Sequence, residues 1–256
     1  MSRRLVLLGA SNLLRGLPTV LRAARAAWGD PLQALAALGF GRSYGMRSAV
    51  LGRTLPAIAD CGLWPALESG PRLPTRAVLT DVGNDILYGA APEQILGWVE
   101  ACLARLRAAG AETVVAGLPL PRLELLSRPG YAALRTIVYP LHRWLPLAEA
   151  RARARTLSAG LEALAAAGGA TFVPAPLHWY GLDPIHVRPG RWREAFRAIL
   201  FAPDAAAAGP AAEPEGTPSL PRVVLARPQR QWLFGRELHH AQPALRLPGG
   251  SSLSLF

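Results

Sequence analysis

Short apolar runs alternate with longer amphipathic segments over most of the chain. The apolar runs have the length of buried strands, are bounded by Gly, Pro, Asp or small-residue turns, and lie at 5–9, 32–38, 77–80, 113–118 and 170–173. The segments between them predict helices at 13–28, 44–59 and 92–109, a broken helical stretch over 131–167, and a helix at 190–201. Because such alternation requires a parallel sheet covered on both faces, the sequence predicts a three-layer α/β/α sandwich with a five-stranded, mostly parallel sheet.

The chain changes character after the predicted catalytic-sized domain, residues 1–201. Residues 202–220 are rich in Ala, Pro and Gly, which predicts a flexible linker. Residues 221–256 contain strand-like pieces at 223–226, 231–234 and 252–256. A unit this short seldom folds alone without a metal or a disulfide. We therefore expect a short β-rich C-terminal appendage that packs on the main domain or on a partner, with a homo-oligomer through this segment as a hypothesis.

The net charge of +11 suggests a polyanionic partner, because basic surfaces bind phosphate by releasing counterions. All 28 residues in the Lys+Arg count are arginines, and apart from the run at 151–156 they are dispersed. Dispersed charges are typical of solvated helix faces. We predict no nucleic-acid partner.

No apolar stretch approaches the roughly 20 residues that a membrane-spanning helix needs. We therefore predict no membrane partner. Arg3 and Arg4 precede an apolar run, 5–8, that is too short for a secretory signal. Cys61 and Cys102 lie far apart and without metal-ligand spacing, as expected for reduced core residues. The predicted location is cytoplasmic.

Ser11 follows the first predicted strand directly, in "LLGASNLLRG". Ligands of open parallel sheets bind beyond the carboxyl ends of the strands, and a helix N-terminus there favours negative charge. Ser11 is therefore a candidate nucleophile. The alternative is that it only caps the following helix, as serines often do.

Three other predicted strands end in residues that suit the same chemistry. The second runs into "GFGRSYG", whose glycines permit close backbone approach to a ligand, and the third into "TDVGNDILYG", which contains Asn84. Both are also common turn sequences. The fifth is followed by "HWYGLDPIHVRPG", in which Asp183 and His186 lie three residues apart. A carboxylate at that spacing can orient an imidazole and leave its other nitrogen as a base.

In this chain order, Ser11, a glycine, Asn84 and the Asp183/His186 pair resemble the SGNH hydrolases, also called GDSL-like esterases and lipases. The resemblance covers about residues 5–201, and "VGND" and "DPIHV" carry it most strongly. Where the family usually has Gly-Asp-Ser, this chain has Gly-Ala-Ser, so a carboxylate that belongs neither to the triad nor to the oxyanion hole is missing.

The resemblance implies a flavodoxin-like fold, a Ser11–His186–Asp183 triad, and an oxyanion hole of the Ser11 and Gly41 N–H groups and the Asn84 amide. Gly45 remains an alternative to Gly41. The predicted function is hydrolysis of a small acyl or acetyl ester, a small-molecule substrate, through an acyl-enzyme intermediate and without a cofactor. An acyltransferase with the same triad, and a non-catalytic ligand- or protein-binding module on the same fold, remain alternatives.

Six more residues lie close to the predicted site and are candidate substrate contacts: Asn12, Arg15, Arg42, Tyr44, Asp85 and Trp179. The alternative for Arg15, Arg42 and Tyr44 is solvated surface, and for Trp179 it is packing. Three of the other four histidines have no partners at ligand spacing, so no metal site is predicted: His142, His239 and His240.

Overall fold

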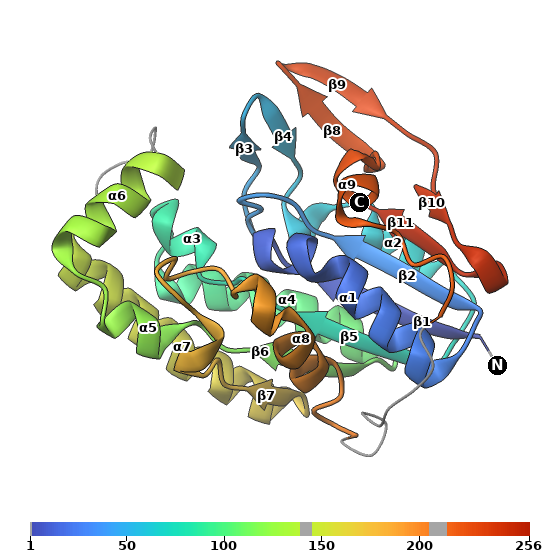
Figure 1. The fold of residues 1–256 in the computed structure, drawn as a ribbon, viewed down its shortest axis with the longest axis horizontal. Coiled ribbons are helices and arrows are strands. Elements are labelled where there is room, and N and C mark those ends of the chain that lie inside the picture. Colours follow the sequence, from blue (N-terminus) through green and yellow to red (C-terminus); the bar gives the residue numbers. More distant parts are fainter. Residues whose placement is uncertain (1, 139–144, 205–213) are drawn as a thin grey trace.

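The protein is described by a computed structural model that covers residues 2–138, 145–204 and 214–256. Its centre is a seven-stranded sheet in the order β10-β11-β2-β1-β5-β6-β7 (Figure 1). Five of the strands match the predicted ones and are parallel: β1 (Arg3–Leu8), β2 (Leu32–Ala37), β5 (Thr75–Leu79), β6 (Glu112–Ala116) and β7 (Thr171–Val173). The predicted fold class is confirmed, with seven strands instead of five.

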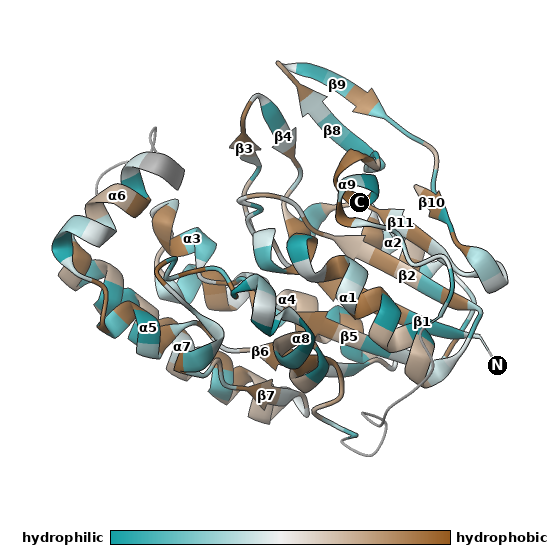
Figure 2. Ribbon diagram, in the orientation of Figure 1, coloured by the Kyte–Doolittle hydropathy of each residue, from teal (hydrophilic) through white to brown (hydrophobic). Residues whose placement is uncertain are grey.

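Helices cover both faces of this sheet. One face packs against α1 (Ser11–Trp28), α8 (Trp192–Leu200) and α9 (Leu220–Leu225). The other packs against α2 (Leu63–Glu68), α4 (Pro92–Ala108) and α7 (Leu147–Gly168). Successive residues of β1 alternate between the two cores, which explains why its sequence is apolar without interruption. Figure 2 shows the resulting hydrophobic colouring of β2 and β5 in the interior.

The two extra strands come from the C-terminal segment. β11 (Ser252–Leu255) pairs in parallel with β2, and β10 (Leu245–Arg246) pairs antiparallel with β11. Leu253 is completely buried and Phe256 is nearly so, within the two cores of this same chain. The sheet of the main domain is therefore completed by residues that lie more than 200 positions from its first strand.

A second, four-stranded sheet is built from two distant parts of the chain. It contains β3 (Ser48–Val50), β4 (Arg53–Leu55), β8 (Arg230–Leu233) and β9 (Arg236–His239), in that order. The predicted helix at 44–59 is wrong, because the chain reverses at Leu51 and Gly52, both at positive φ. The predicted strand at 223–226 is also wrong, since it lies mostly in α9.

Three short or peripheral helices lie at the carboxyl ends of the parallel strands. These are α3 (Asn84–Leu87), α5 (Leu120–Glu124) and α6 (Arg128–Val138). Most of the predicted linker, 205–213, lies outside the described residues. Among the helices of the described part of the chain, none has both the length and the apolar character that crossing a bilayer requires.

Candidate active site

Ser11 is the first residue of α1 and lies at a tight strand-to-helix turn. Gly9 is required there, because a Cβ at this position would lie 2.4 Å from Thr80 Oγ1. The residue in the N-cap position is Ala10, so Ser11 does not cap the helix. Its hydroxyl instead lies 2.9 Å from His186 Nε2. The capping interpretation of this serine is therefore wrong.

His186 lies between Ser11 and Asp183. Its Nδ1 is 2.6 Å from Asp183 Oδ2, while Asp183 Oδ1 accepts the backbone N–H groups of Ile185 and His186 at 3.1 and 3.2 Å. Burial acts to raise the pKa of Asp183, but the hydrogen bond and charge of His186 and these N–H donors outweigh it and lower that pKa. An ionised Asp183 favours a proton on Nδ1, so Nε2 is able to accept the proton of the Ser11 hydroxyl.

Asp81, at the end of β5, is a further residue of the site that the sequence analysis did not assign. Its Oδ2 accepts the backbone N–H groups of Ala10 and Leu13, at 2.7 and 3.2 Å, on either side of Ser11. The signal was present in "TDVGND", a carboxylate at a strand end in a chain that lacks the usual one at position 10. Asp81 thus places a negative charge at the N-terminus of α1, where the helix dipole favours it.

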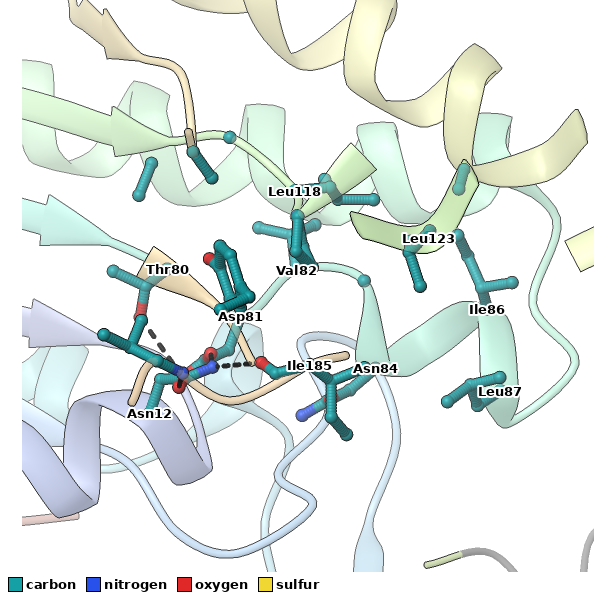
Figure 3. Close-up of a pocket in the computed structure, with 18 of the residues that line it drawn as sticks. Asn12, Thr80, Asp81, Val82, Asn84, Ile86, Leu87, Leu118, Leu123 and Ile185 are labelled. Carbon is teal, nitrogen blue, oxygen red and sulfur yellow. Dashed lines mark hydrogen bonds between the residues drawn. The ribbon is translucent and has the colours of Figure 1, made fainter. Parts of the chain in front are cut away.

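Asn12 joins this turn to the loop that carries His186. Its Nδ2 donates to Asp81 Oδ1 at 2.7 Å and to the Ile185 carbonyl at 2.8 Å, and its Oδ1 accepts the Val187 N–H at 2.8 Å. These bonds are drawn in part in Figure 3. The side-chain amide of Asn12 therefore holds the residues before and after His186.

Asn84 begins α3 and lines the same pocket as Ser11. The two glycines proposed from the sequence differ in their surroundings. Gly45 donates its N–H to Ser43 Oγ at 3.2 Å, and a Cβ there would lie 1.9 Å from the Trp98 ring. Gly41 has φ +59 and its carbonyl accepts the Tyr88 hydroxyl. Both glycines are half-buried, and a Cβ on Gly41 would lie 2.7 Å from the Tyr88 hydroxyl, so both remain candidates for the oxyanion hole.

Three of the six candidate substrate contacts have completely buried side chains that bind other parts of the protein: Arg42, Tyr44 and Asp85. Arg42 donates to backbone carbonyls, and the Tyr44 hydroxyl donates to the carbonyls of Leu8 and Thr80. Asp85 accepts the Ser43 hydroxyl and the Tyr44 N–H, and burial raises its pKa to about 6. All three fix the loop that contains Gly41.

The other candidates have mixed outcomes. Asn12 and Trp179 line the pocket, and the Trp179 indole donates to Glu194 at 3.2 Å. The Arg15 guanidinium lies over the Phe40 ring, 6.0 Å from its centroid. His142 lies outside the described residues, while His239 contacts Glu237 and His240 contacts Gln231. Among the described residues, no group of three or more His, Cys, Asp or Glu side chains could hold a metal ion.

The fold can be compared with known proteins, although no protein-family model and no curated protein matches the sequence. Est24, a carbohydrate acetylesterase from Sinorhizobium meliloti, matches with a TM-score of 0.54 at 16% identity, over 79% of this chain and 99% of that chain. The inhibitor-bound aryl esterase of M. smegmatis matches with a TM-score of 0.52 at 14% identity, again over 79% and 99%. The chain therefore has the fold of these esterases, the fold that the resemblance to SGNH hydrolases implied.

Proposed function

We propose that this protein is a serine hydrolase that cleaves ester bonds with Ser11, His186 and Asp183 as its catalytic triad. The observation that carries the proposal is the continuous chain of contacts from Ser11 Oγ to His186 Nε2 at 2.9 Å and from His186 Nδ1 to Asp183 Oδ2 at 2.6 Å. A structural histidine needs neither a serine hydroxyl at one nitrogen nor a carboxylate at the other. The fold shared with esterases supports the same activity.

In the first step, Ser11 Oγ attacks the ester carbonyl carbon while its proton passes to His186 Nε2. The carbonyl π electrons move to the oxygen, which becomes an oxyanion. Asn84 donates to this oxyanion from its side-chain amide, and Ser11 and Gly41 donate from their backbone N–H groups. The Ser11 N–H suits this role because it lies in the first turn of α1, where backbone donors have no partner within the helix.

In the second step, the ester C–O bond breaks and the leaving alcohol takes the proton from His186, which leaves an acyl group on Ser11. His186 then accepts a proton from water as the water oxygen attacks the acyl carbon. The bond between that carbon and Ser11 Oγ breaks, and Ser11 Oγ takes the proton back from His186, which releases the acid and restores the enzyme. An alcohol acceptor in place of water would make the same site an acyltransferase. Asp183 stabilises the imidazolium in both halves of the reaction.

The proposed substrates are small acyl esters, acetyl esters included. The fold is shared by a carbohydrate acetylesterase and by an aryl esterase. These similarities support ester chemistry but leave the acyl and alcohol groups open, because function depends on the site and not on the fold.

Hydrolysis of p-nitrophenyl butanoate by purified wild type, Ser11→Ala and Ser69→Ala tests the proposal. Ser69 is an exposed serine at the end of α2. Its hydroxyl donates to the Pro65 carbonyl and not to a residue of the triad. We expect kcat/KM to fall by at least about 10³-fold in Ser11→Ala and to stay at the wild-type value in Ser69→Ala. Equal activity in all three proteins would contradict the proposal.

A further inference from the structure

The pocket beside Ser11 is polar at one end and apolar at the other. Figure 3 shows Asn12, Thr80 and Asp81 together on one side and Ile86, Leu87 and Leu123 on the other, with Val82, Leu118, Ile185 and Asn84 between the two groups. The apolar part continues with side chains from α6, from α7 and from the segments that precede them: Leu126, Tyr131, Leu134, Leu147, Ala150 and Ala154. The walls of this part thus come from α3 and α5–α7, while other apolar side chains of the lining come from α8 and from the loop around His186.

The charged side chains that line this pocket are already engaged by the protein. Of the described lining residues, the charged ones are Asp81, which holds the Ser11 turn, and Arg151. The Arg151 guanidinium donates to the carbonyls of Leu123, Glu124 and Leu126 at 2.7–3.1 Å. These hydrogen bonds hold α5 in place beside the pocket. The apolar end offers leucine side chains to a ligand and no anchoring charge.

The position of His186 decides which half of an ester enters this pocket. Ser11 and Asn84 line the pocket, and His186 lies at its edge, since its neighbours Ile185 and Val187 belong to the lining. His186 must deliver a proton to the departing alcohol, so the alcohol leaves on the His186 side. The acyl group, which stays bonded to Ser11, is directed to the other side of the oxyanion donor Asn84, where the leucines lie.

We propose that the pocket walled by α3 and α5–α7 binds the acyl group, and that the enzyme prefers esters of unbranched apolar acids with four or more carbon atoms over acetyl esters. This inference rests on the proposed function and deepens it. An acetyl methyl covers little of an apolar wall built from several leucines. Each methylene moved from water to such a wall strengthens binding by about fourfold, and the factors multiply as the acyl group lengthens.

A series of p-nitrophenyl esters from acetate to octanoate tests the preference, because the leaving group stays constant while the acyl group grows. We expect kcat/KM to rise on the order of tenfold from acetate to butanoate, the gain expected for two methylenes. All esters are used at concentrations below the one at which the octanoate ester aggregates, so that each substrate is fully dissolved. Highest activity on acetate would overturn the proposal and leave the ester-hydrolase proposal intact.

A pair of variants on one short segment locates the acyl site. Leu123 is half-buried and lines the pocket, whereas Leu125, two residues later, is 62% exposed and does not line it. We expect Leu123→Trp to lower kcat/KM for the octanoate ester at least tenfold while changing it less than threefold for acetate. Leu125→Trp should leave the whole chain-length profile at wild type.

The outcomes separate this proposal from the one on which it rests. A Leu123→Trp variant that loses activity equally on all chain lengths, or discriminates by the size of the alcohol in alkyl and aryl acetates, would overturn the acyl-pocket assignment. Absence of hydrolysis for every ester in wild type would instead overturn the proposed function. Circular dichroism of both tryptophan variants confirms that a loss of activity is not a loss of fold.

Discussion

The side chain of Asn12 lies 2.7 Å from that of Asp81 and joins it to the backbone on both sides of His186. Asp81 in turn accepts N–H groups on either side of Ser11. One pair of polar residues thus sets the position of both the nucleophile and the base. The 2.9 Å contact between Ser11 and His186, which come from opposite ends of the main domain, depends on this pair.

Replacing Asn12 with Leu, which has a similar volume but no hydrogen-bonding group, should therefore lower kcat more than it raises KM. We expect a 10- to 100-fold loss of kcat/KM, because small displacements of reacting groups are costly. The buried partners left unpaired should also lower the free energy of unfolding by about 1–3 kcal/mol. Steady-state kinetics and urea unfolding measure the two effects. Wild-type kcat in a destabilised variant would show that Asn12 has only a structural role.

Introducing the carboxylate that the SGNH family usually carries at position 10 should harm this protein. Ala10 is completely buried and its N–H already contacts Asp81 at 2.7 Å, so Ala10→Asp would bring two carboxylates together in the interior. We expect a loss of about 2–4 kcal/mol in the free energy of unfolding. Adding Asp81→Asn removes one of the charges and should recover part of that loss. A double-mutant cycle measures the coupling, and additive effects would contradict it.

The buried carboxyl of Asp85 should make stability fall as pH rises from about 4 to about 6. Burial raises its folded pKa from 3.8 to about 6, although the Ser43 hydroxyl and Tyr44 N–H act to lower it. The folded state therefore binds a proton in this window that the unfolded state has lost, and its stabilising effect disappears as pH passes 6. Relative to Asp85→Asn, wild type should lose up to about 3 kcal/mol between pH 4 and pH 7. Urea unfolding at a series of pH values measures the free energy of unfolding of both proteins. A difference between them that stays constant with pH would contradict this prediction.

Arg42 should matter for stability and not for substrate binding. Its buried guanidinium donates to the carbonyls of Leu38, Pro56 and Phe256, which joins the Gly41 loop to the C-terminal segment. Arg42→Leu leaves these acceptors unpaired, so we expect a loss of about 2–4 kcal/mol in the free energy of unfolding. Arg15→Leu, a control at a half-buried position, should change it by about 0.5 kcal/mol or less. A raised KM without a loss of stability in Arg42→Leu would contradict this account.

The five central strands can be predicted from the sequence, because each is a short apolar run buried on both faces, which leaves a clear pattern. Elements whose place depends on pairing between distant parts of the chain cannot be predicted in this way. β11 has the composition of a strand, but its place beside β2 depends on contacts between residues more than 200 positions apart. The segment 44–59 looked helical by its apolar spacing, yet the positive φ of Leu51 and Gly52 makes it a hairpin.

The residues of the site divide in the same way. Ser11, Asp183 and His186 were predicted from motifs at strand ends, and the structure brings all three together. Arg42, Tyr44 and Asp85 were expected to contact substrate because they are polar and close to the site in sequence. Each proved to satisfy backbone or side-chain groups in the interior, a role that proximity along the chain cannot reveal.

The central claim is that Ser11 is an activated nucleophile, and intact-mass analysis after treatment with a fluorophosphonate tests it most directly. The account predicts one phosphonyl adduct on wild type, mapped to the peptide that contains Ser11, and no adduct on Ser11→Ala. His186→Ala should be labelled at least about 10²-fold more slowly, since the base that activates the hydroxyl is gone. A folded wild type that takes up no adduct, or an adduct that persists in Ser11→Ala, would contradict the claim.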